Sequence, residues 1–340
     1  MTSTDLRVGV VGAGLMGADH IARITKRISG AIVSAVIEPD EGRGTAALQN
    51  APGAQWFTSI EDAIAANAVD AVVIATPGKF HEPVLLPALA AKLPILCEKP
   101  LTADSASSLR VVEAEMAASD RPLIQLGFMR RFDAEYARLR EIIASGEAGE
   151  LLALRAVHRN PDVPETYTQD MLINDSVVHE LDVIPWLAGS EIRSIEIKYM
   201  RRNPNSPERL REPILVLLEL ENGILVDVEM NVSIKFGYQV ATEAVFSNGL
   251  ARIGQANGLQ TWSDGAFAKE EHRSFVTRFA AAYDVQIQRW VDAVARGTID
   301  GPDAFHGYRV ALACEAGVKA FDGGIVEVQQ VERPAFYDKA

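Results

Sequence analysis

The stretch LRVGVVGAGLMG, residues 6–17, decides the fold of this chain. Its apolar run at 8–11 ends at the first of three glycines, Gly12, Gly14 and Gly17, and apolar residues with helical spacing follow. Strand, tight turn and helix, in this order, are the setting in which a G-x-G-x-x-G motif binds a pyrophosphate. The first glycine permits the turn, the second lets backbone N–H groups approach the phosphates, and the third lets the helix pack closely on the strand. The positive end of the helix dipole favours the same negative charge.

A carboxylate follows the next expected strand. The segment AIVSAVI, residues 31–37, has the composition of a buried strand and ends beside Glu38. A carboxylate about 20 residues beyond the glycines is placed to accept a hydrogen bond from a ribose 2′-hydroxyl. Because the same charge repels a 2′-phosphate, the sequence predicts NAD rather than NADP as the cofactor. The alternative is a glycine-rich turn in an α/β domain that binds no cofactor.

Composition and charge limit the class of protein. A chain of 340 residues, 48% of them hydrophobic, is long enough for about two domains with sizeable cores. The net charge of −13 argues against nucleic acid and anionic membranes as partners. Cys97 and Cys314, the two cysteines, are too few and too far apart for a disulfide framework or a metal site. We expect a cytoplasmic protein, because no signal-like segment opens the chain and no apolar run approaches the roughly 18 residues of a membrane span.

Strand and helix alternate through the first part of the chain. The continuous apolar segment at 70–75 suits a parallel sheet that is covered on both faces. Further short buried strands are expected at 94–97 and 123–127, with a helix between them. The sequence therefore predicts a doubly wound, NAD-binding Rossmann domain over residues 1–128.

The pattern changes over residues 129–340, where long alternating strands dominate. Asn222-Gly223 lies between two such strands and is a strong hairpin signal. A helix is expected over 274–295, because its apolar residues repeat along one stripe. We predict an α+β domain with a large, mostly antiparallel open sheet, which binds the substrate and forms the oligomer. Sheets this wide often keep one face for another subunit.

Lys99 is the first candidate for chemistry. It lies in Cys97-Glu98-Lys99-Pro100, directly after the fifth expected strand. Ligands of open parallel sheets bind beyond the carboxyl ends of the strands. A lysine there can donate to a substrate hydroxyl and stabilise developing negative charge. The structural alternative is a solvated loop lysine paired with Glu98.

Asp175 and His179 form the second candidate. A helix is expected over 175–187, and residues four apart on a helix share a face. A carboxylate against an imidazole orients the ring and stabilises its protonated form, which makes His179 a candidate acid/base near neutral pH. The alternative is that Asp175 caps the helix and His179 is a semi-buried structural histidine. His179 and Asp182 lie one turn apart, which also suits a metal; no third ligand is evident, so we expect none.

Two further polar positions are candidates for substrate contacts. Arg130 lies in Gly127–Phe132, where the chain passes from the first expected domain to the second. Its side chain could reach substrate hydroxyls or tie the domains together. His158 ends an expected strand and could face a cleft between the domains.

The ordered set of segments GAGLMG, ATPGKFHEP, CEKPL, GFMRRFD and NDSVVHELD resembles the glucose-fructose oxidoreductase/inositol dehydrogenase/rhizopine catabolism family. The resemblance covers essentially the whole chain, and the last two segments are most similar to its myo-inositol 2-dehydrogenase branch. It implies a Rossmann domain followed by a domain with an open antiparallel sheet, assembled as a tetramer. It also implies catalytic roles for Lys99, Asp175 and His179.

The resemblance extends to the binding residues. It implies that Arg130 approaches the substrate, together with Lys99, Asp175 and His179, and that His158 and Tyr238 make polar contacts with it. The residues that we predict to bind the cofactor are Gly12, Gly14, Leu15, Met16, Gly17, Glu38, Thr76, Pro77, His81, Glu98 and Lys99. Two departures from the family pattern are Glu38-Pro39, where aspartate is usual, and the loop Gly78-Lys79-Phe80.

The expected reaction is the oxidation of a ring secondary alcohol held between the nicotinamide and the second domain. On the resemblance, this is myo-inositol oxidised to 2-keto-myo-inositol, with His179 as the base and Lys99 bonded to the same oxygen. An alternative substrate is scyllo-inositol or a pyranose sugar. A non-catalytic NAD-sensing regulator is a reading from another class, against which the presence of Lys99, Asp175 and His179 argues. A relative that cycles a permanently held cofactor between two sugars is a third reading.

Overall fold

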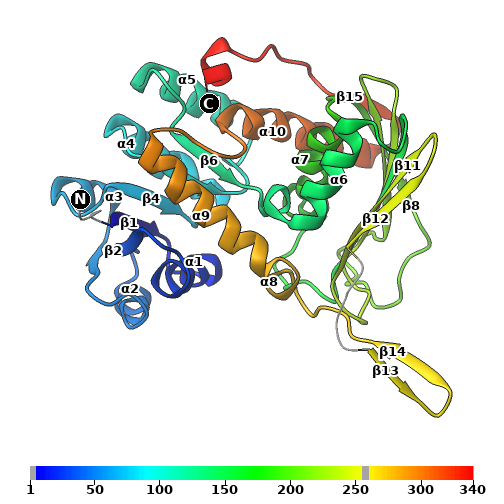
Figure 1. The fold of residues 1–340 in the computed structure, drawn as a ribbon, viewed down its shortest axis with the longest axis horizontal. Helices are drawn as coiled ribbons and strands as arrows, with labels where there is room; N and C mark the ends of the chain where they lie inside the picture. Colours follow the sequence, from blue (N-terminus) through cyan, green and yellow to red (C-terminus); the bar gives the residue numbers. More distant parts are fainter. Residues whose placement is uncertain (1–4, 255–259, 340) are drawn as a thin grey trace. The chain divides into compact units, whose positions relative to one another are not determined.

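The computed structural model describes residues 5–254 and 260–339, which belong to two compact units (Figure 1). The first unit comprises Met1–Met129, Tyr283–Ala311 and Val331–Ala340, and the second comprises Arg130–Ala282 and Leu312–Gln330. The sequence places a boundary after residue 128 and assigns everything beyond it to the second domain. The structure instead returns two later stretches to the first unit, because their side chains complete its core.

The first unit contains six parallel strands in the order β3-β2-β1-β4-β5-β6. The strands are β1 (Leu6–Val11), β2 (Ala31–Ile37), β3 (Gln55–Phe57), β4 (Ala71–Ile74), β5 (Ile95–Glu98) and β6 (Ile124–Gly127). This is the strand order of a dinucleotide-binding Rossmann sheet, which confirms the predicted fold class. The order reverses between β1 and β4, and ligands of such sheets bind at this switch point, beyond the carboxyl ends.

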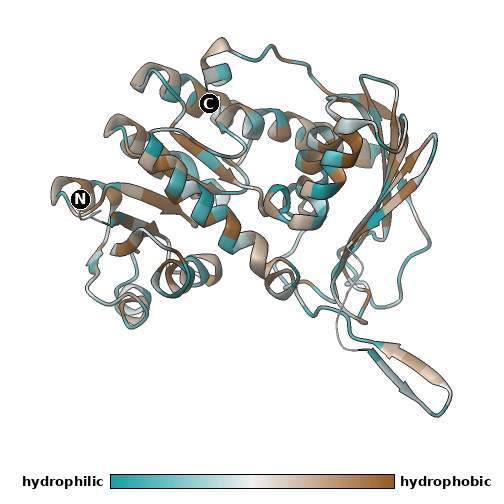
Figure 2. Ribbon diagram, in the orientation of Figure 1, coloured by the Kyte–Doolittle hydropathy of each residue, from teal (hydrophilic) through white to brown (hydrophobic). Residues whose placement is uncertain are grey.

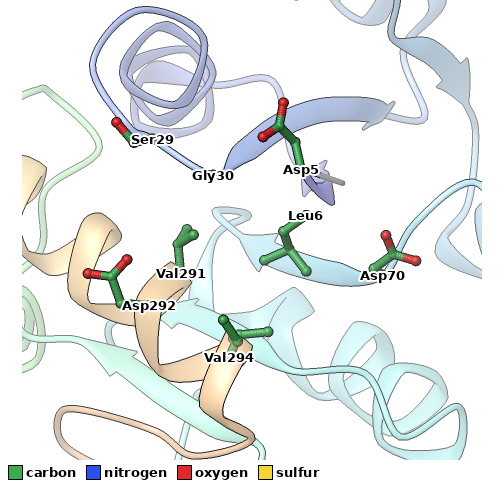
Figure 3. Close-up of a pocket in the computed structure, with 9 residues that line it drawn as sticks. Asp5, Leu6, Ser29, Gly30, Asp70, Val291, Asp292 and Val294 are labelled. Atoms are coloured by element: carbon green, nitrogen blue, oxygen red, sulfur yellow. The ribbon is translucent and has the colours of Figure 1, made fainter. Parts of the chain in front are cut away.

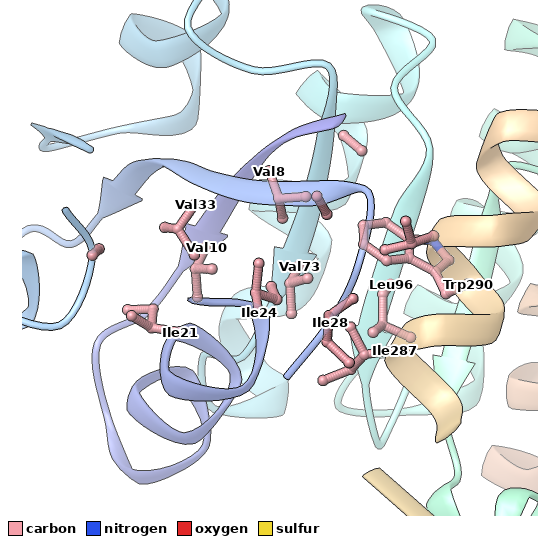
Figure 4. Close-up of a cluster of buried hydrophobic side chains, with 14 of the residues drawn as sticks. Val8, Val10, Ile21, Ile24, Ile28, Val33, Val73, Leu96, Ile287 and Trp290 are labelled. Atoms are coloured by element: carbon pink, nitrogen blue, oxygen red, sulfur yellow. The ribbon is translucent and has the colours of Figure 1, made fainter. Parts of the chain in front are cut away.

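Helices cover this sheet and complete its core. They are α1 (Leu15–Lys26), α2 (Glu41–Leu48), α3 (Ile60–Ala65), α4 (His81–Ala90), α5 (Ser105–Ala118), α9 (Ala280–Arg296) and α10 (Ala304–Lys319), the last of which continues into the second unit. Val8 and Val10 of β1 pack with Ile24 of α1 and with Ile287 and Trp290 of α9 (Figure 4). The contribution of α9 to this core explains why a late segment belongs to the first unit. The strands of the sheet are mainly hydrophobic (Figure 2).

The second unit is built on seven strands in the order β12-β11-β7-β10-β9-β8-β15. They are β7 (Leu151–Arg159), β8 (Ile192–Tyr199), β9 (Ile214–Leu220), β10 (Leu225–Asn231), β11 (Gln239–Phe246), β12 (Leu250–Ile253) and β15 (Ile325–Glu327). Neighbours pair antiparallel, except for the parallel pair of β7 and β10, so the predicted mostly antiparallel sheet is confirmed. The predicted hairpin joins β9 to β10, with Gly223 at φ +83°.

Two helix predictions for residues beyond 128 need correction. The segment expected to form one helix over 274–295 breaks at Phe279 into α8 (Phe275–Arg278) and α9. The segment expected to be an α-helix from Asp175 begins as a π-helix, η3 (Leu172–Val177), and continues as α7 (Val178–Ala188). The remaining elements are α6 (Ala134–Ser145), the two-stranded sheet β13 (Gln260–Ser263) and β14 (Ala266–Lys269), and the short helices η1 (Gly78–Phe80), η2 (Met129–Phe132), η4 (Ala320–Asp322) and η5 (Ala335–Lys339).

None of the helices within residues 5–254 and 260–339 is long and apolar enough to cross a membrane.

Candidate active site

The glycine turn after β1 is shaped by backbone alone. Gly12 adopts φ +92°, and its N–H donates to the carbonyl oxygen of Ile37 at 2.8 Å. A Cβ on Gly17 would lie 1.8 Å from the carbonyl oxygen of Gly12, so only glycine lets α1 pack this closely. A Cβ on Gly14, the residue that precedes α1, would meet nothing within 4 Å. The turn therefore leaves open space at the helix N-terminus, and this fits the pyrophosphate of a dinucleotide.

Glu38 is bonded to the same turn. Its side chain is buried directly after β2, where Oε2 accepts from the backbone N–H of Ala13 at 2.9 Å. Oε1 accepts from the N–H of Asp40 at 3.1 Å and from Nη2 of Arg43 at 2.8 Å. Burial by itself raises the pKa of Glu38, but these hydrogen bonds outweigh it and hold the pKa below its usual value. The ionised carboxylate is the form that accepts hydrogen bonds from ribose hydroxyls and repels phosphate.

His81 connects the loops that follow β4 and β5. Its ring is fully buried, with Nε2 located 2.7 Å from the carbonyl oxygen of Thr76 and Nδ1 located 2.7 Å from that of Pro100. Lys99, partly exposed at the end of β5, directly precedes Pro100. Both ring nitrogens thus face backbone oxygens, which suits a role in positioning Lys99 better than the cofactor contact predicted for His81.

Other predicted cofactor-binding residues surround the glycine turn. Thr76 packs on Gly12, and its buried Oγ1 has no hydrogen-bond partner among the described residues, so a bound ligand could satisfy it. Pro77 is exposed beside it. In the first turn of α1, Leu15 is 72% exposed and Met16 is partly exposed. The structure therefore groups these side chains at the carboxyl edge of the sheet, and their contact with the cofactor stays a prediction.

Glu98 has a partner that sequence reasoning missed. The buried ring of His20, on α1, lies with Nε2 2.8 Å from Oε1 of Glu98 and donates to this carboxylate. Gly127, on the neighbouring strand β6, makes room for the pair, since a Cβ there would lie 2.9 Å from Oε2. The pair fastens the end of β5, and so the residue before Lys99, to the helix after the glycine turn. The signal that the sequence offered for this pair was a histidine at a buried position of α1.

A buried ion pair organises the second unit. Nη1 of Arg130 donates to Oε1 of Glu180, and both side chains are 1% exposed. Nδ1 of His158 lies 3.1 Å from Nη2 of Arg130 and 3.1 Å from Oε2 of Glu180. Burial raises the pKa of Glu180, but the charge of Arg130 and the contact with His158 lower it overall, so the carboxylate is ionised. Arg130, predicted to contact the substrate, therefore holds Glu180 and His158 in place.

Three predicted substrate residues come together around this pair. The ring of His158, on β7, lies 6.0 Å from that of Tyr238 and 6.3 Å from that of His179, measured between centroids. His179 belongs to α7, and Tyr238 precedes β11, where its N–H donates to the carbonyl oxygen of His272 at 2.6 Å. Burial raises the pKa of Tyr238, so its hydroxyl stays protonated. The cluster offers several hydrogen-bonding groups suited to a polyol.

Sequence reasoning missed two buried polar residues of the second unit. Glu180 lies within the quoted segment NDSVVHELD, and a charge in so apolar a helix needs a buried partner. Asn160 follows His158 by two positions, and its buried Oδ1 has no hydrogen-bond partner in the described part of the chain. Nothing in the sequence around Asn160 indicates that its side-chain oxygen is buried.

The π-helix determines where Asp175 lies. Its turn is held by Tyr167, whose hydroxyl donates to the carbonyl oxygen of Met171 and lies 2.7 Å from Oγ of Ser176. Asp175 is exposed within this turn, and the position that caps α7 belongs to Val177, so the alternative of Asp175 as the helix cap is wrong. Single π-helical turns occur often at functional sites. The pairing of Asp175 with His179 stays a prediction.

Asp182 has a cationic partner. Its Oδ2 accepts from Nε of Arg131 at 3.0 Å and its Oδ1 from Nη2 at 2.5 Å. This pairing explains the burial of Asp182 one turn beyond His179. No group of three or more His, Cys, Asp or Glu side chains that could hold a metal ion occurs within residues 5–254 and 260–339.

A hollow of about 420 Å³ in the first unit lies elsewhere (Figure 3). Leu6 and Asp70 line it, at the amino ends of β1 and β4, with Val291 and Asp292 of α9. Asp70 is occupied by the guanidinium of Arg7, whose Nε donates to it at 2.9 Å. Because the hollow lies at the amino ends of these strands, it is at the edge of the sheet opposite to the glycine turn. None of the predicted site residues lines it.

The strand order, the glycine turn and the carboxylate after β2 define a dinucleotide-binding protein. The model of the GFO/IDH/MocA oxidoreductase family, NAD-binding Rossmann fold, matches residues 6–126. The model of the GFO/IDH/MocA C-terminal domain matches residues 136–252. The chain belongs to this family, and the resemblance noted in its sequence is confirmed.

Relatives within the family match nearly the whole chain. The inositol 2-dehydrogenase of Corynebacterium glutamicum strain R is 68% identical over 98% of this chain and 99% of its own length. That of Leifsonia xyli subsp. xyli is 68% identical, with 99% of both chains covered. Among solved structures, the myo-inositol dehydrogenase of Lactobacillus casei in complex with NAD(H) and myo-inositol superposes with a TM-score of 0.95. That structure is 31% identical and covers 98% of this chain and 100% of its own.

Proposed function

We propose that this protein is an NAD-dependent inositol 2-dehydrogenase, which oxidises the C2 hydroxyl of myo-inositol to the ketone 2-keto-myo-inositol. The observation that carries the proposal is the 68% identity, over nearly the full length, to relatives named inositol 2-dehydrogenase. The cluster of His158, His179 and Tyr238 supports it, because a polyol needs many hydrogen-bonding partners. The ionised Glu38 beside the glycine turn supports NAD as the cofactor.

The proposed chemistry removes a proton from the hydroxyl oxygen and a hydride from C2. His179 accepts the proton as general base, and Asp175 orients its ring and stabilises the charge that forms. Lys99 donates a hydrogen bond to the same oxygen and stabilises negative charge as the carbonyl develops. A nicotinamide ring supplies the hydride acceptor when the cofactor is bound. NADH and the ketone are the products.

The remaining polar residues orient the substrate. His158, held through Nδ1 by Arg130 and Glu180, keeps its other nitrogen for a substrate hydroxyl. The neutral phenol of Tyr238 provides a second group that can donate or accept. His81 and the pair of His20 and Glu98 support the loop that carries Lys99.

A substrate panel tests the proposal. Initial rates of NADH formation are measured with myo-inositol, scyllo-inositol, glucose and xylose, each with NAD and NADP, and the ketone is identified by NMR. We expect the highest kcat/KM with myo-inositol and NAD. A higher kcat/KM with scyllo-inositol or a pyranose would show that this compound, and not myo-inositol, is the substrate. NAD binding without turnover of any polyol would favour the regulator, and NAD(H) retained through dialysis would favour the sugar-cycling relative.

We further propose a cytoplasmic homotetramer with no nucleic-acid or membrane partner. The family resemblance supports the tetramer, and the net charge of −13 argues against binding to anionic polymers and surfaces. Light scattering coupled to size exclusion measures the mass of the assembly. A mass of one chain at micromolar concentration would contradict the tetramer.

A further inference from the structure

The carboxylate that selects NAD is paired with an arginine. Oε1 of Glu38 accepts from Nη2 of Arg43 at 2.8 Å, and the two side chains are 6% and 64% exposed. Glu38 is anchored from the other side by the N–H groups of Ala13 and Asp40. One partner of the ion pair is thus fixed and buried, while most of the other faces solvent.

The position of Arg43 is defined by the packing of its helix. Its neighbour Gly44 is buried against Trp56, since a Cβ at Gly44 would lie 2.3 Å from Nε1 of that ring. Trp56 in turn donates from Nε1 to the carbonyl oxygen of Glu38 at 2.9 Å. Because α2 is seated tightly on this tryptophan, the backbone of Arg43 is held near Glu38, and its guanidinium remains within reach of the same place when the ion pair is broken.

We propose that Arg43 is a second determinant of cofactor choice, whose guanidinium takes the 2′-phosphate of NADP and lets this site bind NADP as a weaker second cofactor. The inference rests on the proposed function, because it assumes that the glycine turn and Glu38 hold the adenosine half of the dinucleotide. Glu38 alone repels a 2′-phosphate. Arg43 offsets part of that charge, and its planar fork of donors matches the oxygens of a phosphate.

Opposite effects follow for the two partners. Removing Arg43 leaves the charge of Glu38 unopposed, so the ratio of the Kd for NADP to the Kd for NAD rises. Removing the charge of Glu38 releases the guanidinium for the phosphate, so the same ratio falls. The gain from the second change depends on Arg43 being present. Because NAD and NADP differ only in the 2′-phosphate, the ratio of their Kd values is unaffected by changes that weaken binding of their common parts equally.

Isothermal titration calorimetry with NAD and NADP, on the full chain without substrate, measures both Kd values. We expect R43A to raise the NADP/NAD ratio about tenfold, as for a charged hydrogen bond at a partly exposed site, and R43K, which keeps the charge but not the fork of donors, to raise it by less. E38Q should lower the ratio by about tenfold or more, and E38Q/R43A should lose most of that gain, keeping only the relief from the repulsion by Glu38. The matched control is R27A, an arginine that is 57% exposed and paired with Asp284 in the same unit.

Two results would overturn the inference: an R43A ratio that matches the R27A ratio, or an E38Q/R43A variant that keeps the gain of E38Q. Far-UV circular dichroism shows whether each variant folds. Because Arg43 is exposed, R43A tests the inference even if the E38Q variant fails to fold. Failure of the proposed function gives a different result, since the wild type would then lack NAD binding or inositol-dependent NADH formation.

Discussion

The two units build their candidate binding residues from different materials. In the first unit the cofactor edge consists mainly of backbone: Gly12 adopts the positive φ of the turn, Gly17 lets α1 pack closely, and Gly14 leaves open space. In the second unit the cluster consists of side chains, held by the buried pair of Arg130 and Glu180. A backbone site is sensitive to the addition of a single methyl group. A side-chain site is sensitive to the loss of a single charge.

One buried carboxylate in each unit shows a related difference, in whether neutral donors or a cation are provided to it. Glu115, in the first unit, accepts from the N–H groups of Leu123 and Ile124 and from the hydroxyl of Tyr337, each at 2.7 Å. Burial raises the pKa of Glu115 to about 7. Glu180 faces a guanidinium, and its pKa is lowered. At Glu115 the neutral hydrogen-bond donors do not offset the desolvation of the carboxylate, whereas at Glu180 the paired cation does.

The largest expected effect is on turnover. H179A removes the proposed base, so kcat/KM for myo-inositol should fall by about 10² to 10⁴-fold. K99A removes the proposed hydrogen-bond donor and should also lower kcat/KM. Steady-state NADH formation measures it, with H306N and K26A as matched controls outside the candidate site. Near wild-type kcat/KM in either variant would show that its assigned role is wrong.

Removal of Glu180 should have the next largest effect. E180A leaves the guanidinium of Arg130 buried without its carboxylate, which costs about 3–5 kcal/mol in the free energy of unfolding. Urea denaturation measures the loss. E219Q, at an exposed pair with Arg193, is the control and should change stability by less than about 0.5 kcal/mol. A loss in E180A no larger than in E219Q would break the contrast between the two units.

The carboxyl of Glu115 predicts a pH dependence of stability. Because its folded pKa of about 7 exceeds the ordinary value of 4.5, its protonation stabilises the folded state fully below pH 4.5, and this contribution is lost as the pH rises through about 7. E115Q mimics the protonated acid, so above pH 7 it should be more stable than the wild type by about 3 kcal/mol. Denaturation from acid to mildly alkaline pH tests this, with the exposed E113Q as control. Parallel curves for wild type and E115Q would contradict it.

The smallest effects separate packing from binding at the glycine turn. G14A adds a methyl group where nothing lies within 4 Å, so the protein should keep its stability while the Kd for NAD rises about tenfold. G17A places its methyl group against the carbonyl of Gly12 and should destabilise the fold by about 1–3 kcal/mol. Calorimetric titration and thermal unfolding distinguish the two outcomes. Unchanged NAD affinity in G14A would show that the open space at Gly14 is not the pyrophosphate site.

Much of the fold could be predicted because its signals are local. The strand before Gly12, the carboxylate at Glu38 and the hairpin at Asn222-Gly223 each depend on a few adjacent residues. The helix prediction at Asp175 was wrong in type, since the turn that contains it is π-helical. The hydroxyl of Tyr167, eight residues earlier in the chain, helps to hold that turn.

The sequence by itself determined the Rossmann class, the preference for NAD and the membership of an oxidoreductase family, because each follows from short motifs in a recognisable order. Only the tertiary structure decided how the buried charges pair. Glu98 and His20 are 78 residues apart, and Arg130 and Glu180 are 50 residues apart. The structure also decided that α9 completes the core of the first unit. Such pairings depend on which elements the fold brings together, and no local pattern of residues encodes that choice.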